Sequence, residues 1–124
     1  MRPASKAAKR KPQRIAKTGT EPLQAGMILS NEPGYYKKGS YGIRIENLIL
    51  VAAPEQIEGG EIAMPGFETL TLVPIDRRLV KPGLLSAGEV DWLNAYHARV
   101  RETLAPLLDE NDRLWLEKAT APIG

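Results

Sequence analysis

The clearest periodic pattern in this chain lies between residues 43 and 51, which read IRIENLILV. Successive side chains of a strand point to opposite faces, so one face here carries Ile43, Ile45, Asn47, Ile49 and Val51. The other face carries Arg44, Glu46, Leu48 and Leu50. Because apolar residues occur on both faces, the pattern predicts a central strand that is covered on both sides.

Two further strands are predicted, one on each side of this run in the sequence. Residues 23–30 (LQAGMILS) contain a short apolar run that suits a buried strand. Residues 67–74 (FETLTLVP) form a third strand, which its final proline closes. The stretches between the strands, 31–42 and 53–66, are rich in Gly and Pro and are expected to be turns or loops.

Two helices are predicted after the strands. Ser86 and Glu89 fit a capping box, in which the two residues satisfy each other's backbone donors. After this capping box, mostly apolar residues recur every three or four positions and form one packing face of the predicted helix. These residues are Val90, Leu93, His97, Val100, Leu104 and Leu107. Pro106 is expected to end the helix. A second helix is expected over 109–120, opened by acidic residues and carrying Leu114, Trp115 and Ala119.

This order of elements predicts an α+β fold class, with antiparallel-type strands first and two helices after them. Three regions are expected: a basic tail over 1–20, a strand-rich part over 21–80 and a helical part over 81–124. The tail has few bulky apolar residues and two prolines, so it is expected to be disordered. Three strands and two helices barely close a core, and a covered strand needs more partners, so we expect the chain to be part of something larger.

Charge is distributed unevenly along the 124 residues. Residues 1–17 hold seven basic side chains and no acidic one, which leaves ten basic against fifteen acidic residues in the remainder. The basic tail could act as a nucleic-acid arm, a contact for anionic membranes or a transit peptide, or it could be a solvated tail without such a role. The high isoelectric point belongs to the tail, so it does not mark the whole chain as a nucleic-acid-binding protein.

Composition excludes several kinds of site. The chain has no cysteine, which excludes disulfides and thiolate metal sites and is consistent with a cytoplasmic location. No apolar run approaches the ~20 residues that a membrane span needs. The single histidine, His97, lies on the apolar side of the predicted helix and is expected to pack or hydrogen-bond there. A Ser-His or Cys-His nucleophilic site is therefore not expected.

The candidate chemistry lies at Glu32, Arg44 and Glu46. Arg44 and Glu46 are two apart on the predicted strand and share a face, so an ion pair between them would explain both. Glu32 precedes Pro33, which forces an extended backbone at the start of a turn. If Glu32 and Glu46 converge, they would suit a hard divalent cation or a two-metal centre. Spacing alone leaves the ion pair and the metal site both open.

Four separated blocks of the sequence resemble one known family. They are GMILSNEPGYYKKGSYGIRIENLILV, FETLTLVPIDRRL, LLSAGEVDWLNAYHARVRETLAPLL and WLEKATAPI, in this order. The chain is similar over about 12–123 to the C-terminal part of Xaa-Pro aminopeptidase (aminopeptidase P), in its longer form with an extra C-terminal helical segment. The resemblance implies that 21–80 form the C-terminal portion of a pita-bread catalytic domain and that 81–124 form the helical segment.

The resemblance also implies a function and roles for residues. Enzymes of this family hydrolyse the bond before a penultimate proline with water that is activated by two divalent ions, usually manganese. Their ligands are two aspartates, a histidine and two glutamates. By motif, Glu32 matches the ligand that is considered the general base, Glu46 matches the bridging ligand, and Arg44 matches an arginine that supports the ligands. Peptides with proline in second position are the implied partners, and no nucleic acid or membrane is expected.

The upstream aspartates and histidines of the family have no counterpart in this sequence. We therefore expect a C-terminal fragment that binds divalent ions weakly, lacks aminopeptidase activity alone and exposes unpaired strand edges. An alternative is a non-catalytic interaction module, in which this part forms a homodimer or associates with a full-length paralogue.

Overall fold

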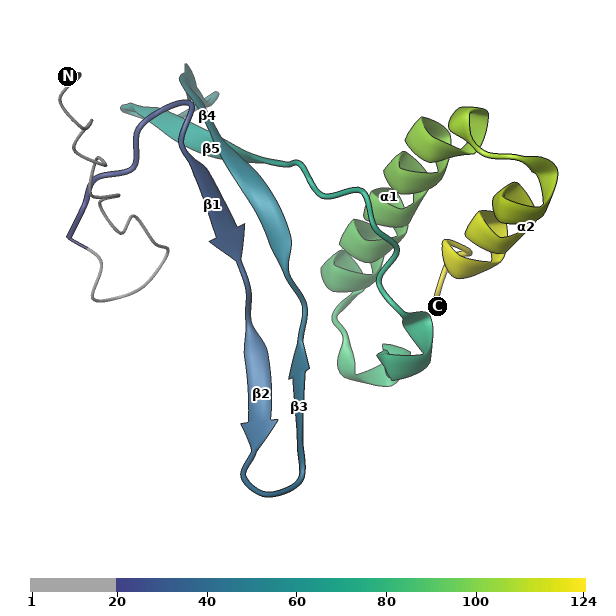
Figure 1. The fold of residues 1–124 in the computed structure, drawn as a ribbon. Helices are drawn as coiled ribbons and strands as arrows, with labels where there is room; N and C mark the ends of the chain where they lie inside the picture. Colours follow the sequence, from purple (N-terminus) through teal and green to yellow (C-terminus); the bar gives the residue numbers. More distant parts are fainter. Residues whose placement is uncertain (1–19) are drawn as a thin grey trace, which may run out of the picture. The chain divides into compact units, whose positions relative to one another are not determined.

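The computed structural model describes residues 20–124 (Figure 1), and the chain divides into two compact units, Met1–Thr71 and Leu72–Gly124. Almost all of the expected basic tail over 1–20 lies outside the described residues. The three regions expected over 1–20, 21–80 and 81–124 therefore stay predictions. Antiparallel sheets followed by two main helices confirm the α+β fold class.

The first unit contains a three-stranded antiparallel sheet in the order β1-β4-β5, formed by β1 (Ile28–Asn31), β4 (Asn47–Gln56) and β5 (Ala63–Thr69). Residues 47–51 of the strand predicted over 43–51 lie in β4, the central strand of this sheet. The hydrophobic core of this sheet consists of Leu29, Ile49 and Val51, against which Leu23 and Met27 pack. The expectation that both faces are covered is wrong, because Leu48 on the other face is 46% exposed.

The stretch expected to be a turn over 31–42 is mostly a hairpin. It contains β2 (Gly34–Lys37) and β3 (Tyr41–Arg44), which pair antiparallel, and only the tip is a turn. Gly39 has φ of 71° at this tip, a left-handed backbone conformation that favours glycine. Both strands are exposed throughout.

The strand expected to run unbroken from 43 to 51 is interrupted at residues 45 and 46. The cause lies across the hairpin at Pro33. The backbone N–H of Ile45 donates to the carbonyl oxygen of Pro33 at 3.2 Å, but proline has no N–H to return the bond. As Figure 1 shows, β1 leads into β2 and β3 leads into β4, so the four strands form one long hairpin with a gap in its ladder.

The loop expected over 53–66 is largely strand, because β4 and β5 continue past the sheet as a second hairpin. Their register shifts between Val51 and Pro54. The third strand ends at Thr69, earlier than expected. The Leu70 N–H donates to the Leu48 carbonyl at 2.8 Å, and the Leu48 N–H then donates to the hydroxyl of Thr71 at 2.8 Å. A side chain thus takes the donor that a longer β5 would have used.

The second unit consists of helices joined by short 3₁₀ turns. Its elements are η1 (Arg77–Leu79), η2 (Pro82–Leu84), α1 (Ala87–Leu104), η3 (Ala105–Leu107) and α2 (Glu110–Ala119). The predicted capping box is confirmed: Ser86 Oγ accepts from the Glu89 N–H, and the Glu89 carboxylate accepts from the Ser86 N–H at 2.8 Å. Helix α1 ends two residues before Pro106, as expected. No helix among residues 20–124 combines the length and the apolar character needed to cross a membrane.

The core of this unit consists of Leu93, Tyr96, Val100 and Leu116. One expectation about the packing face of the first helix is wrong, because Leu107 is 77% exposed. Helix α2 buries Leu116, whereas Leu114 and Trp115, which the sequence analysis placed on this helix, are 50% and 61% exposed. A ten-residue helix has too few apolar positions for periodicity to fix its buried face, so contact with α1 decided it.

His97 is fully buried, and the backbone N–H of Ile75 donates to its Nε2 at 3.0 Å. The expected packing and hydrogen-bonding role is therefore confirmed. Burial lowers the pKa of the imidazole, and the positive charge of Arg77 lowers it further. The bond also requires a neutral ring, because a proton on Nε2 would remove the acceptor. His97 thus fixes the extended segment 72–76 to α1 in its neutral form.

We expect the second unit to lose stability as pH falls below about 6.5, the ordinary histidine pKa. The folded-state pKa of His97 is lowered, so the unfolded chain binds the proton more readily and stability is fully present only above that pH. Denaturant unfolding at several pH values between about 7.5 and 5.5 tests this. His97→Gln keeps an acceptor but cannot titrate, so its free energy of unfolding should depend less on pH. The same dependence on pH in both proteins would contradict the expectation.

Candidate metal and catalytic site

The long hairpin places Glu32 opposite Glu46. Asn31 pairs with Asn47 on one side of the gap in the ladder, and Gly34 pairs with Arg44 on the other side. These two pairs share one register, so Glu32 faces Glu46 across the gap. Directly opposite residues of an antiparallel pair have side chains on the same face, with Cβ atoms roughly 4.5–5.5 Å apart. The register therefore places Glu32 and Glu46, which are fourteen residues apart in the sequence, at facing positions of the hairpin.

Two polar neighbours on the same face hold these carboxylates. Arg44 Nη1 donates to Glu32 Oε2 at 2.7 Å, and Ser30 Oγ donates to Glu46 Oε1 at 2.6 Å. Both bonds run diagonally across the hairpin and connect its two strands. The ion pair that spacing left open, between Arg44 and Glu46 along one strand, is not the one formed. The arginine pairs instead with Glu32 on the facing strand.

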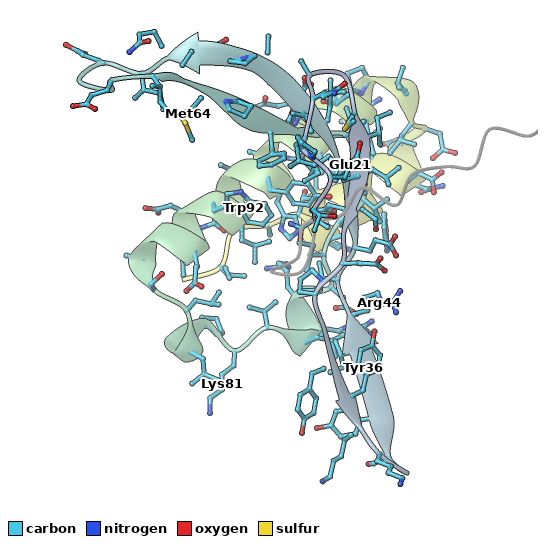
Figure 2. All side chains as sticks on the ribbon, turned by 90° about the vertical axis from the view of Figure 1, so that its left-hand side faces the viewer. Glu21, Tyr36, Arg44, Met64, Lys81 and Trp92 are labelled. Carbon is cyan, nitrogen blue, oxygen red and sulfur yellow. The ribbon has the colours of Figure 1, made fainter. Side chains whose placement is uncertain are left out.

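Tyr36 fixes the other side of the Arg44 guanidinium (Figure 2). Arg44 Nε donates to Tyr36 Oη at 2.8 Å, and the guanidinium carbon lies 5.9 Å from the centre of the ring. This contact is the largest cause of the raised pKa of Arg44, followed by the charge of Glu32. The arginine thus stays charged and is directed at Glu32 by two partners at once.

Two glycines make room for the Tyr36 ring. A Cβ atom on Gly34 would lie 2.7 Å from Tyr36 Oη, and one on Gly42 would lie 2.7 Å from Tyr36 Cδ1. The ring therefore occupies the space that side chains at 34 and 42 would fill. The sequence analysis did not identify this role of Tyr36. The sequence contains the signal: Gly42 lies directly opposite Tyr36, and Gly34 precedes Tyr36 by two residues on the same face.

The site is open to solvent and supplies few ligands. The side chains of Glu32 and Arg44 are 46% and 49% exposed, so solvent screens their ion pair and the pair alone adds little stability. Among residues 20–124 there is no cluster of three or more His, Cys, Asp or Glu side chains that could hold a metal ion. What this chain offers is a pair of facing carboxylates, each braced from the opposite strand. Carboxylate oxygens are the donors that Mg²⁺ and Mn²⁺ prefer.

Comparison with known families gives two matches that together span most of the chain. Residues 6–53 match the model of metallopeptidase family M24, and residues 63–123 match that of the C-terminal region of peptidase M24. Among curated relatives, Aminopeptidase P2 of Arabidopsis thaliana is 50% identical over 106 residues, which cover 83% of this chain and 15% of that protein. The probable Xaa-Pro aminopeptidase P of Tuber melanosporum is 44% identical over 104 residues, covering 82% and 17%.

A solved structure agrees with the sequence relatives. X-prolyl aminopeptidase from Caenorhabditis elegans, described as a cytosolic enzyme with a di-nuclear active site, matches with a TM-score of 0.71 and 39% identity. The match covers 82% of this chain and 17% of that one, so this chain spans about a sixth of the proteins that it resembles. This structural match supports the expectation that the strands form the C-terminal part of a pita-bread domain. The chain therefore belongs to metallopeptidase family M24, and its residues match the C-terminal part of the Xaa-Pro aminopeptidases.

Proposed function

We propose that this chain supplies part of the catalytic centre of an Xaa-Pro aminopeptidase, which releases the N-terminal residue before proline. The observation that carries the proposal is the facing of Glu32 and Glu46, each braced by a residue of the opposite strand. Like charges placed directly opposite in a sheet destabilise it by roughly 0.2–1 kcal/mol. A shared cation would turn that repulsion into attraction.

The donor set fits a pair of divalent ions, for which manganese is our proposal. Both side chains present oxygen donors on one face, and the di-nuclear site described for the nematode enzyme supports two ions. Glu32 and Glu46 would hold them together with ligands from outside residues 20–124. When bound, two such ions supply a nucleophile from water at neutral pH and polarise the scissile carbonyl.

The remaining work falls to side chains of this chain. Glu32 is the proposed general base, which accepts a proton from the attacking water. Arg44 holds the Glu32 carboxylate through one oxygen and leaves the other free to act. Tyr36 accepts from Arg44 Nε and so keeps the guanidinium in place, which makes it a positioning residue. Ser30 holds Glu46 in the same way from the facing strand.

The proposal includes a requirement for more polypeptide. Two carboxylates are too few for a tight two-metal site, so the remaining ligands must come from a longer form of the protein or from an associated chain, such as a full-length paralogue. The substrates proposed are peptides with proline in second position. A cytoplasmic location is proposed by analogy with the enzyme described as cytosolic.

The purified 124-residue chain should not cleave a tripeptide with proline in second position, even with added Mn²⁺. Its two carboxylates do not complete the centre. Chromatography of the released first residue measures the cleavage. Co-expression with the upstream part of a relative should generate activity that Glu32→Gln abolishes, while Glu55→Gln, an exposed residue of β4, leaves it intact. Robust cleavage by the chain alone would contradict the proposal.

Removing one of the facing charges should stabilise the metal-free hairpin. We expect Glu46→Gln to raise the free energy of unfolding by roughly 0.2–1 kcal/mol, because it removes the repulsion from Glu32 and keeps an acceptor for Ser30. Added Mn²⁺ should stabilise the original chain more than this variant. Denaturant unfolding with and without Mn²⁺ measures both effects, with Glu55→Gln as the control. Equal metal responses in all three proteins would exclude Glu46 as a ligand.

A further inference from the structure

The long hairpin of the first unit consists of two halves that are stabilised very differently. In the proximal half, β1 and the start of β4 contribute Leu29 and Ile49 to a buried core. In the distal half, every residue of β2 and β3 is exposed. A two-stranded hairpin without a core is only marginally stable in water. The order of the distal half therefore depends on how it is joined to the proximal half.

Pro33 weakens the junction between the two halves. Along an antiparallel ladder, pairs of residues that exchange two hydrogen bonds alternate with pairs that exchange none. The Ile45 N–H donates to the Pro33 carbonyl at 3.2 Å, so these two residues form a hydrogen-bonded pair. Proline has no N–H for the second bond of this pair, and both strands are interrupted here, at residues 32–33 and 45–46. The halves are thus joined through one backbone hydrogen bond at a position where two are usual.

Each half of the hairpin holds one of the two facing carboxylates. In the distal half, Arg44 of β3 donates to Glu32 at 2.7 Å, and Tyr36 of β2 fixes this arginine from the same half (Figure 2). In the proximal half, Ser30 of β1 donates to Glu46 at 2.6 Å. A bend at the junction therefore moves the two carboxylates with different halves and changes the separation between them.

We propose that Pro33 is a positioning residue that makes the junction a hinge, and that a divalent cation bound by both Glu32 and Glu46 locks this hinge. Without a cation, the like charges repel one another, and the missing ladder bond lets the halves move apart. A cation bound by both carboxylates joins the distal half to the proximal half. The inference rests on the proposed function only because it assigns a cation to these two side chains.

The hinge has a consequence for the site itself. A ladder with both bonds at position 33 would hold the two carboxylates at one separation, whether or not an ion is present. With one bond missing, Glu32 and Glu46 can adjust to a cation whose other ligands come from outside residues 20–124. Binding then also fixes Arg44 and Tyr36, because both lie in the distal half.

Hydrogen exchange of the 124-residue chain, measured by mass spectrometry of its peptides, tests the hinge without metal. Pro33→Val supplies the missing donor and favours the extended backbone. The amides of β2 and β3 should then exchange at least about threefold more slowly than in the original chain, because one hydrogen bond is gained. Unchanged exchange in these strands would overturn the hinge.

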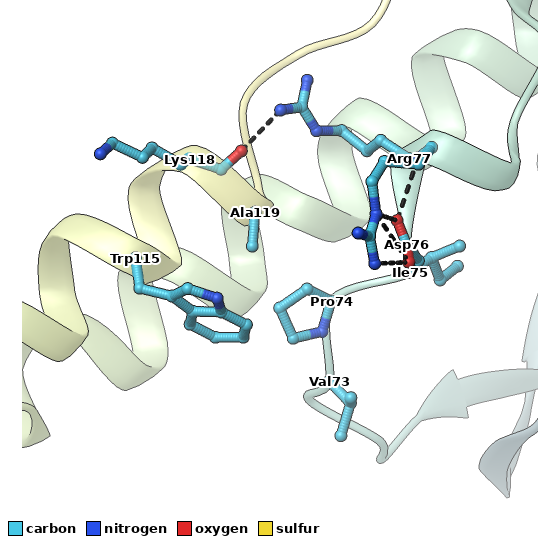
Figure 3. Close-up of a pocket in the computed structure, with 9 residues that line it drawn as sticks. Val73, Pro74, Ile75, Asp76, Arg77, Trp115, Lys118 and Ala119 are labelled. Atoms are coloured by element: carbon cyan, nitrogen blue, oxygen red, sulfur yellow. Dashed lines mark hydrogen bonds and ion pairs between the residues drawn. The ribbon is translucent and has the colours of Figure 1, made fainter.

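Two controls accompany this experiment. Pro54→Val makes the same substitution in the other hairpin of β4 and should leave β2 and β3 unchanged. The segment 73–78 is an internal reference, because Arg77 donates to the Lys118 carbonyl at 2.6 Å and so ties this segment to α2 (Figure 3). Its exchange should be the same in every variant.

A second arm adds Mn²⁺ at millimolar concentration. In the original chain, the ion should slow exchange in β2 and β3 at least about threefold and in β1 by less. This gain should be smaller in Pro33→Val, whose hinge is already closed, and absent in Glu46→Gln, which lacks one ligand. The proposal is overturned if Mn²⁺ does not slow exchange in β2 and β3 of the original chain, or if Pro33→Val gains as much as the original chain.

The hinge and the proposed function can fail independently. Protection of β2 and β3 by Mn²⁺, together with no cleavage by the co-expressed chains, would support the hinge and contradict the catalytic role. Cleavage that requires Glu32, without protection of β2 and β3, would overturn the hinge alone.

Discussion

Two like charges face one another across an antiparallel hairpin, and most of the first unit is arranged around this constraint. Glu32 and Glu46 share one register position, where repulsion works against the ladder. Diagonal bonds from Arg44 and Ser30 offset part of it. Pro33 leaves the ladder open at this point, so the backbone there carries fewer hydrogen bonds than in the flanking strands. A protein that needed only a stable hairpin would gain nothing from this arrangement.

The residues that hold Arg44 in place extend the effect of this constraint to several neighbouring positions of the hairpin. The guanidinium is held from one side by Glu32 and from the other by Tyr36, whose ring lies over two glycines. Gly34 and Gly42 weaken a strand by their flexibility and lack of a side chain. Here they create the space for the ring. Four residues of modest individual effect therefore position the Glu32 carboxylate, as the supporting residues of a functional site do.

The second unit has a different basis of stability. A capped helix, a small apolar core and several side-chain bonds to backbone carbonyls hold it together. Neutral His97 and charged Arg77 both fix the extended segment that leads into α1. The same bonds therefore hold the segment 72–76 and the two helices together as one unit. Exposed apolar residues such as Leu48 in the first unit are consistent with the shortness of the chain relative to its relatives.

The sequence by itself determined the features that depend on near neighbours or on motif. Ser86 and Glu89 set the start of α1, Pro106 set its end, and alternation identified the central strand; the four resembling blocks indicated the family. Tertiary structure decided what depends on residues distant in sequence. It paired Arg44 with Glu32 across the hairpin, turned an expected turn into β2 and β3, and buried Leu116 in place of Trp115. The reason is physical: capping and alternation act within a few residues, whereas strand register and helix packing depend on contacts that only the folded chain makes.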